Sequence, residues 1–208
     1  MMACARQMKV TQQGVTSGKW GRPTGDALID RTALIIGLGA VGSALARRLH
    51  AMGMRILATD LHPPENPSDT WGLSEVATPD RLDALIPRAD FVISTATLTP
   101  DTQGRLNRSF FERMKPTAYL INISRGPIVN EEDLLDALNR GEIAGAGLDV
   151  LNREPPPLDH PFLHHDRIVI TPHTAGVTQQ SFGALGRAVA DNIIRLKEGR
   201  PLKNVAAT

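Results

Sequence analysis

Short apolar runs and helical patterns alternate along the chain. The apolar runs predict strands at 33–36, 55–59, 73–78, 91–94, 119–123, 143–150 and 167–170. Helical spacing covers 43–49, 79–88, 107–114 and 131–140, and further helices are predicted at 1–8 and 178–198. Strands that alternate with helices predict an α/β fold, with a doubly wound, mostly parallel sheet and helices on both faces.

The first strand runs directly into a glycine motif, Gly-x-Gly-x-x-Gly at 37–42, and then into a helix. Gly37 permits the tight turn, Gly39 lets a pyrophosphate approach the backbone, and Gly42 lets the helix pack close to the sheet. The free N–H groups of the helix N-terminus suit phosphates. The second strand ends in Asp60, 18 residues after Gly42, where a carboxylate is expected to hold ribose hydroxyls. This context predicts a Rossmann-type dinucleotide site.

Polar residues and glycines follow nearly every predicted strand. Ligands of such sheets bind beyond the carboxyl ends of the strands. The candidates at these ends are Gly37 to Gly42, Asp60, 95–102, Ser124 and Arg125, 149–154, and His173. A sheet with only a structural role does not need such residues at six successive strand ends.

Three of these residues could carry chemistry. Arg125 precedes Gly126-Pro127, and its guanidinium could bind a substrate carboxylate or carbonyl; the alternative is a salt bridge. His173 could move one proton near neutral pH, although a lone histidine is more often structural. Glu154 could orient the His173 ring, or it is a surface acid. The other histidines are expected to be structural: His50, His62, His160, His164 and His165.

Composition narrows the alternatives. The 208 residues are 41% hydrophobic and 22% charged, which is typical of a globular protein. The formal net charge of +1 is spread over mixed charges, so we expect neither a nucleic-acid partner nor a membrane surface. No signal peptide or 20-residue apolar span is apparent. The single cysteine, Cys4, fits a cytoplasmic protein, and we expect no metal site.

The chain is divided by sequence into an N-terminal helix and arm (1–30), a dinucleotide-binding domain (31–178) and a C-terminal helix and tail (179–208). Residues 11–30 are rich in Gly, Thr and Pro, which favours an extended arm. Trp20 on this arm either packs on its own domain or reaches a partner subunit. Three prolines in 61–69 predict a loop.

Six segments of the chain form a recognisable set: Gly37 to Gly42, Leu98 to Thr102, Asn122 to Val129, Gly147 to Val150, Glu154-Pro155 and Thr171 to Gly176. In these segments, which appear in family order, the chain resembles the D-isomer-specific 2-hydroxyacid dehydrogenases. The segments cover essentially the whole chain.

The resemblance implies hydride transfer between NAD and a 2-hydroxyacid or 2-oxoacid. Arg125 would bind the substrate carboxylate and carbonyl, His173 would act as acid and base, and Glu154 would pair with His173. NAD would be held by glycines and small residues around the loop and by polar strand ends: Gly37, Gly39, Ala40, Val41, Gly42, Asp60, Ala96, Thr102, Ile123, Ser124, Asp149, His173 and Gly176. Asp60 favours NAD over NADP, because a carboxylate repels a 2′-phosphate.

The chain also departs from the family pattern. The segment that builds the smaller, substrate-binding lobe is almost absent, so the cleft would be open to water, which weakens catalysis. Thr97 stands where the family usually has proline. Two interpretations follow: a dehydrogenase or its cofactor half, or a non-catalytic NAD-binding or dimerisation module. A methyltransferase-like nucleotide domain would leave Arg125 and His173 unused. By family analogy we expect a homodimer.

Overall fold

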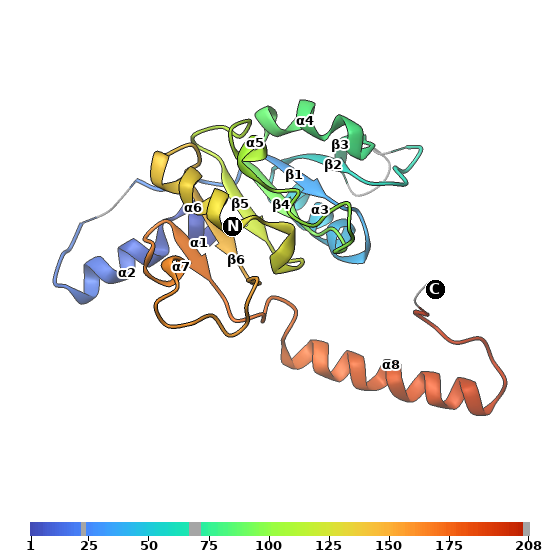
Figure 1. Cartoon of the computed structure of the whole chain (residues 1–208). Helices are drawn as coiled ribbons and strands as arrows, with labels where there is room; N and C mark the ends of the chain where they lie inside the picture. Colours follow the sequence, from blue (N-terminus) through green and yellow to red (C-terminus); the bar gives the residue numbers. More distant parts are fainter. Residues whose placement is uncertain (22–23, 67–71, 206–208) are drawn as a thin grey trace. The chain divides into compact units, whose positions relative to one another are not determined.

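Seven parallel strands form one sheet in the described part of the chain, and Figure 1 shows them side by side. Their order is β3-β2-β1-β4-β5-β6-β7, and every neighbouring pair is parallel. The strands are β1 (Thr32–Ile36), β2 (Arg55–Thr59), β3 (Leu73–Ala77), β4 (Phe91–Ser94), β5 (Tyr119–Asn122), β6 (Gly145–Leu148) and β7 (Ile168–Ile170). The predicted α/β fold is confirmed. The strand order reverses between β1 and β4, the switch point at which such sheets bind ligands.

This computed structural model describes residues 1–21, 24–66 and 72–205. The chain divides into two units, Met1–Pro172 and His173–Thr208. The first contains the whole sheet. The helices are α1 (Met2–Ala5), α2 (Met8–Thr16), α3 (Ala40–Ala51), α4 (Leu82–Leu85), α5 (Arg108–Phe111), α6 (Glu131–Arg140), α7 (Pro161–His164) and α8 (Gln179–Lys197), with 3-10 turns η1 (Pro79–Arg81), η2 (Ile86–Arg88) and η3 (Gly126–Ile128).

Alternate strand residues bury opposite faces of the sheet, as the period of a strand requires. Leu34 of β1 and its neighbours on the same face pack in a core with residues of α4, α5, α6 and α7. Ala33 and Ile35 face the other way and pack in a second core with residues of α1 and α3. Because both faces are covered, the interior strands β1, β4 and β5 are mostly apolar, whereas the edge strand β3 contains Ser74 and Glu75.

Capping explains the best-predicted helix, α6. The Asn130 side chain caps its first turn by accepting from the Asp133 N–H at 3.1 Å. Three acids lie in the first turn and Arg140 in the last, which suits the helix dipole. Gly141 then ends the helix with φ of 72°. The predicted span of 131–140 is therefore confirmed.

The N-terminal predictions need correction. The expected helix at 1–8 is two helices, α1 and α2, because Gln7 has a left-handed backbone (φ 49°) that interrupts the helix. Residues 11–16 belong to α2 and are not part of an extended arm. Glycines and prolines of that segment are concentrated after residue 17, and Gly18, with φ of 77°, follows the helix.

Two further helices are shorter than predicted. Residues 79–88 form η1, α4 and η2 in succession rather than one helix, since Pro87 cannot donate the backbone hydrogen bond that a continuing helix needs. The helix predicted at 107–114 is regular only over α5, with Asn107 as its N-cap. The four-residue α7 was not predicted.

Two sequence expectations concern exposed segments. Trp20 is 94% exposed, so the expectation that it packs on its own domain is wrong, and its contact with a partner stays a prediction. The loop expected at 61–69 is irregular from Leu61 to Asn66; residues 67–69 lie outside the described part of the chain.

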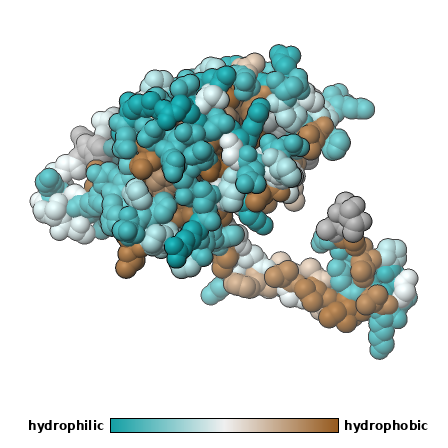
Figure 2. All heavy atoms as spheres, in the orientation of Figure 1, coloured by the Kyte–Doolittle hydropathy of each residue, from teal (hydrophilic) through white to brown (hydrophobic). Residues whose placement is uncertain are grey.

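The second unit contains α8 and the segment that follows it. The Thr178 side chain caps α8, together with Ser181 in a capping box. After the helix, the Asn192 amide exchanges two hydrogen bonds of 2.9 Å with the Lys203 backbone, which fastens the tail to α8. Apolar side chains along α8 are exposed, among them Phe182, Leu185, Val189, Ile193 and Leu196. Brown spheres follow the helix in Figure 2. Within 1–21, 24–66 and 72–205, no helix combines the length and apolar character needed to cross a membrane.

Candidate functional site

The glycine motif has the geometry that its spacing predicts. Gly37 has φ of 96°, a conformation that L-residues with a side chain rarely adopt. A Cβ on Gly42 would lie 2.0 Å from the Gly37 carbonyl oxygen, so α3 can start this close only with glycine there. At Gly39, the N-cap of α3, an added Cβ would meet no atom of the described residues within 4 Å outside its chain neighbours. The space above Gly39 is therefore open to a ligand.

The N-terminus of α3 faces that open space. Ala40 and Val41 are exposed and occupy its first two positions. The first N–H groups of a helix have no acceptor within it, and here they lie at the positive end of a helix of 12 residues. These groups can hold phosphate oxygens.

Asp60 follows β2 and is hydrogen-bonded to two backbone groups. Its Oδ2 accepts from the Leu38 N–H at 2.6 Å, and its Oδ1 accepts from the His62 N–H at 2.9 Å. The first bond fixes the carboxylate against the glycine motif. Each carboxylate oxygen has about two lone-pair positions, so Asp60 can still accept from ribose hydroxyls.

The segment after β4 supports the glycine motif. Thr95 Oγ1 donates to the Gly37 carbonyl at 2.6 Å, and a Cβ on Gly37 would lie 3.0 Å from the Cα of Ala96. Ala96, predicted to line the adenine side, is thus adjacent to the glycine motif. Thr102 Oγ1 donates to the Thr97 carbonyl at 2.8 Å. Its hydroxyl therefore closes the 97–102 turn, and contact with adenine stays a prediction.

A buried polar cluster lies at the end of β5. Asn122 accepts from both the N–H and the hydroxyl of Ser124, at 3.1 and 2.7 Å, and donates to the Arg125 carbonyl at 3.0 Å. Ser124 Oγ also lies 2.8 Å from Ser94 Oγ. Arg125 itself is exposed, and Ile123, predicted to border nicotinamide, is half-buried in the same turn.

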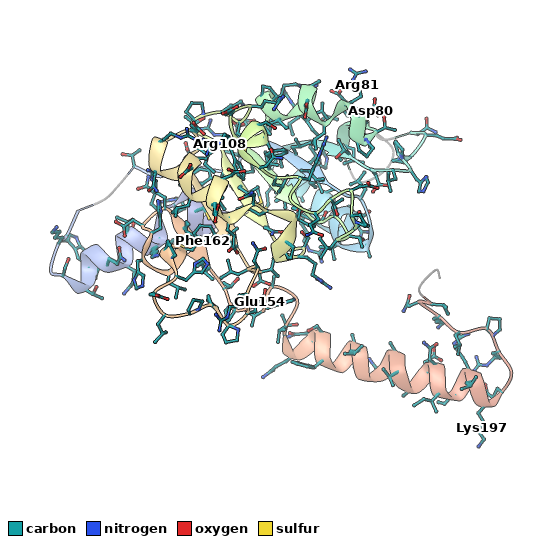
Figure 3. All side chains as sticks on the ribbon, in the orientation of Figure 1. Asp80, Arg81, Arg108, Glu154, Phe162 and Lys197 are labelled. Atoms are coloured by element: carbon teal, nitrogen blue, oxygen red, sulfur yellow. The ribbon has the colours of Figure 1, made fainter. Side chains whose placement is uncertain are left out.

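The turn that carries Arg125 touches the loop that carries Glu154. A Cβ on Gly126 would lie 2.1 Å from the Leu151 carbonyl, so the two backbones are in close contact. The Leu151 N–H donates to Glu154 Oε1 at 2.9 Å, and Figure 3 shows Glu154 in the loop beyond β6. The turn that carries Arg125 and the loop that carries Glu154 therefore adjoin at one edge of the sheet, and a joint role of the two side chains stays a prediction.

Asp149 ends β6 at the same edge. It is buried, and its Oδ1 accepts a hydrogen bond from the hydroxyl of Thr171, which follows β7. Its N–H donates to the Asn122 carbonyl at 3.0 Å. Asp149 is thus bonded to both neighbouring strands, through its carboxylate to the residue after β7 and through its backbone to β5.

His173 and Gly176 belong to the second unit, so their place relative to Arg125 and Glu154 stays a prediction. Both are exposed. His173 has φ of 54°, a left-handed conformation that is uncommon for residues other than glycine. Strained backbone of this kind is concentrated at functional sites.

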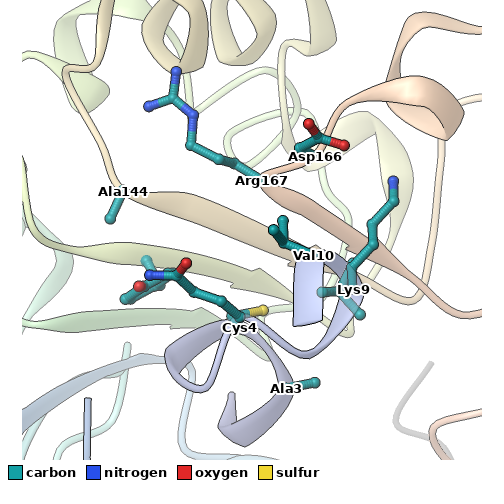
Figure 4. A pocket seen from close by; sticks show the side chains of 10 residues that line it. Ala3, Cys4, Lys9, Val10, Ala144, Asp166 and Arg167 are labelled. Atoms are coloured by element: carbon teal, nitrogen blue, oxygen red, sulfur yellow. The ribbon is translucent and has the colours of Figure 1, made fainter. Parts of the chain in front are cut away.

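A pocket of about 170 Å³ lies at the opposite edge of the sheet, beside the amino ends of β5, β6 and β7 (Figure 4). Its lining cations have protein acceptors: Lys9 Nζ donates to three backbone carbonyls, of Leu163, His165 and Ile168, and Arg167 donates to the Leu138 carbonyl at 2.5 Å. Burial raises the pKa of the Cys4 thiol at this pocket. It is separate from the candidate site.

Sequence reasoning missed the residues that hold the site residues in place. Ser94 was not singled out, and Thr95, Asn122 and Thr171 entered only as members of longer segments. Each is a polar residue at the carboxyl end of a strand, and Ser94 and Asn122 are also buried. A polar residue at the end of an otherwise apolar strand was the available signal.

Comparison with known proteins agrees with this geometry. The profile of the family described as "D-isomer specific 2-hydroxyacid dehydrogenase, NAD binding domain" matches residues 1–175. The human glyoxylate reductase/hydroxypyruvate reductase is 37% identical over 208 residues, which cover 97% of this chain and 62% of that protein. The D-3-phosphoglycerate dehydrogenase of Archaeoglobus fulgidus is 34% identical, over 98% of this chain and 38% of that protein.

Solved structures are similar throughout the chain. The NADPH-dependent glyoxylate/hydroxypyruvate reductase of Sinorhizobium meliloti, in complex with NADP and sulfate, gives a TM-score of 0.85 at 30% identity, over 99% of this chain and 64% of that one. The D-lactate dehydrogenase of Lactobacillus jensenii, with NAD⁺, gives 0.86 at 26% identity, over 100% and 66%. The chain spans less than two thirds of these relatives. It belongs to the D-isomer specific 2-hydroxyacid dehydrogenase family and comprises the NAD-binding domain of that family.

Proposed function

We propose that this chain binds NAD(H) and takes part in hydride transfer between the cofactor and a 2-hydroxyacid/2-oxoacid pair. Arg125 binds the substrate carboxylate, His173 is the acid and base, and Glu154 pairs with His173. The observation that carries the proposal is the carboxyl edge of the sheet, where the open Gly39, the fixed Asp60 and the exposed Arg125 follow β1, β2 and β5.

The residues of this edge fit a dinucleotide. The N-terminus of α3 offers N–H groups to the pyrophosphate, with room above Gly39 for its oxygens. Asp60 retains lone pairs for the adenine ribose, and its charge favours NAD over NADP. Asp149, buried and oriented by Thr171, would accept from the nicotinamide carboxamide. The residues that would contact the pyrophosphate, the adenine ribose and the carboxamide thus follow β1, β2 and β6, respectively.

The reaction requires one hydride and one proton. Nicotinamide, when bound, supplies or accepts the hydride at the substrate C2. His173 donates the proton to the 2-oxo oxygen during reduction and accepts it from the hydroxyl during oxidation. Arg125 offers a planar set of donors that suits a carboxylate, and a carboxylate at Glu154 beside His173 would favour the protonated ring.

The test is NADH oxidation with glyoxylate, hydroxypyruvate and pyruvate as substrates. We expect wild-type protein to bind NADH and to oxidise it only weakly, with at least one of them. His173→Ala should lose about 100-fold or more of the rate, since a general acid contributes that much. His164→Ala, an exposed histidine whose ring contacts the Leu158 carbonyl, is the control and should keep the rate. An equal background rate in all three proteins would contradict the proposed reaction.

A second candidate is an NAD-binding or dimerisation module without turnover. The 94% exposed side chain of Trp20, and the apolar side chains of α8 that its own unit leaves uncovered, favour assembly with another chain. We propose a homodimer and a cytoplasmic location, which the single, buried Cys4 suits. Light scattering at micromolar concentration should give twice the monomer mass, and a monomer mass would contradict the homodimer.

A further inference from the structure

We propose that Asn122 is a positioning residue for Arg125. Its side chain reaches both ends of the dipeptide that carries the guanidinium: it accepts from the Ser124 N–H at 3.1 Å and donates to the Arg125 carbonyl at 3.0 Å. The role of Arg125 as a carboxylate-binding residue rests on the proposed function. That Asn122 sets the conformation of this turn rests on these contacts alone.

The backbone of Asn122 is held in place by the sheet. Asn122 is the last residue of β5 and is paired in register with Ser94 of β4 and Leu148 of β6. It is 1% exposed. Because Asn122 belongs to an interior strand, the hydrogen bonds of its side chain hold the turn after β5 in a fixed position relative to the sheet.

The direction of the hydrogen bonds extends this cluster to Ser94. The single hydroxyl hydrogen of Ser124 is donated to Asn122 Oδ1 at 2.7 Å. The contact of 2.8 Å between the two serine hydroxyls therefore requires Ser94 to donate to Ser124. Donation runs from Ser94 to Ser124 to Asn122, and all three side chains are buried. Such a network holds one arrangement when every group is satisfied.

The network affects the direction of the free N–H groups of the Arg125 guanidinium. Arg125 Nη1 donates to the Ser124 carbonyl at 2.7 Å, which uses one of the five N–H groups of the side chain. Within residues 1–21, 24–66 and 72–205 the guanidinium makes no other hydrogen bond or ion pair. Its remaining donors can bind a carboxylate, and their direction follows from the Ser124–Arg125 backbone that Asn122 fixes.

The alternative is that the turn is set by its own backbone. The Arg125 carbonyl also accepts from the Ile128 N–H at 3.3 Å, within η3, and Pro127 restricts the chain there. If these features were sufficient, removing the Asn122 amide would leave Arg125 in place. The two accounts therefore differ in a measurable way.

The experiment compares Asn122→Ala, Asn122→Asp and Ser94→Ala with wild type. Asp keeps the acceptor for Ser124 but loses the donor to Arg125, and Ser94→Ala removes only the outermost bond and should fold normally. Asn130→Ala, the N-cap of α6, is the matched control, because it removes a side-chain hydrogen bond next to the site without touching the Arg125 turn. Order is read from the ¹⁵N heteronuclear NOE of Arg125 Nε, assigned with Arg125→Lys.

Binding provides the second readout. Oxamate, an unreactive 2-oxoacid analogue, is titrated in the presence of NADH, and ADP-ribose reports on the adenosine side. We expect Asn122→Ala to lower the NOE and to weaken oxamate binding about tenfold, with Asn122→Asp intermediate and Ser94→Ala mildest. ADP-ribose affinity should stay within about twofold in every variant, since its site follows other strands.

The outcomes separate the two proposals. An Asn122→Ala protein that binds ADP-ribose normally and keeps the wild-type NOE and oxamate affinity overturns the positioning role. If Asn130→Ala lowers the NOE as much as Asn122→Ala, the effect is general loosening, and the role is again overturned. If wild type binds neither NADH nor ADP-ribose, the proposed function fails, while the NOE comparison still decides whether Asn122 orders Arg125.

Discussion

The carboxylate of Asp60 accepts a hydrogen bond of 2.6 Å from the N–H of Leu38. This bond connects the residue after β2 to the glycine motif after β1, two segments 22 residues apart in sequence. The acid that would bind ribose and the loop that would bind pyrophosphate are therefore fixed relative to each other before any ligand arrives. Preorganisation of this kind reduces the entropy lost on binding.

Replacing Asp60 should reduce the affinity for the cofactor more than it reduces the stability of the fold. We expect Asp60→Ala to lower NADH affinity by about 10- to 100-fold, because hydrogen bonds to a charged group contribute about 1.5–3 kcal/mol. The preference for NADH over NADPH should also narrow, since the repelling charge is gone. Calorimetric titration of both cofactors measures the two effects.

The control for this experiment is Asp166→Asn, a residue beside the pocket at the opposite edge of the sheet. It should bind both cofactors as wild type does. An Asp60→Ala protein with wild-type NADH affinity would show that the carboxylate serves only to brace the glycine motif.

The glycines of the motif should respond differently to alanine. A Cβ on Gly42 would lie 2.0 Å from a backbone oxygen, so Gly42→Ala should lose about 1–3 kcal/mol of stability. At Gly39 the added methyl meets open space, so the free energy of unfolding of Gly39→Ala should lie within about 0.5 kcal/mol of the wild-type value. Its NADH affinity should nevertheless fall about tenfold, because the methyl occupies the place of the phosphate.

Urea unfolding and calorimetry separate the two glycine effects. Gly21→Ala, which also meets open space, is the control and should change neither quantity. Equal NADH affinity in Gly39→Ala and wild type would mean that the pyrophosphate does not approach this backbone.

Asp90 should make stability depend on acid pH. Its side chain is 16% exposed, and burial by itself raises its pKa. The hydrogen bonds from Lys115 Nζ and the Thr32 N–H, together with nearby positive charges, outweigh burial and bring the pKa below its ordinary value. A depressed folded-state pKa adds stability above the unfolded pKa of about 3.9, and this stability is lost as pH falls through the folded value.

Asp90→Asn should therefore be less stable than wild type by about 1–3 kcal/mol at neutral pH, and the difference should shrink below about pH 4. Urea unfolding from about pH 2.5 to about pH 7, which includes the unfolded pKa, measures this. The exposed Asp101, changed to Asn, provides the control. A stability difference between Asp90→Asn and wild type that stays constant with pH would show that the ionised Asp90 carboxylate does not stabilise the start of β4.

Local features of the sequence were enough to predict the sheet and the glycine motif. The interior strands β1, β4 and β5 are short apolar runs buried on both faces. Gly37 requires glycine for its φ of 96°, and Gly42 requires it for the close approach to the Gly37 carbonyl, both within the turn itself. The break at Gln7 was not predictable, because a left-handed residue other than glycine leaves no pattern. The short α7 was missed because four residues carry no periodicity.

Side-chain networks between distant segments were beyond sequence reasoning. The Ser94–Ser124 contact joins residues 30 positions apart, and the Asp149–Thr171 contact joins residues 22 apart. The motif predicts Thr102 as a cofactor residue; its hydroxyl closes its own turn, and its contact with adenine stays a prediction. Spacing identifies which residues reach the ligand-binding edge, but the bonds that orient them depend on strand order.

The central claim is that NADH lies across the carboxyl ends of the strands, with its reactive ring facing both Arg125 and His173. A crystal structure of the chain with NADH and oxamate tests it most directly. The account predicts the pyrophosphate at Gly39 to Val41, the adenine ribose on Asp60, and oxamate between the guanidinium and the imidazole. A complex in which Arg125 and His173 lie on opposite sides of the bound nicotinamide, or in which NADH binds elsewhere, would contradict it.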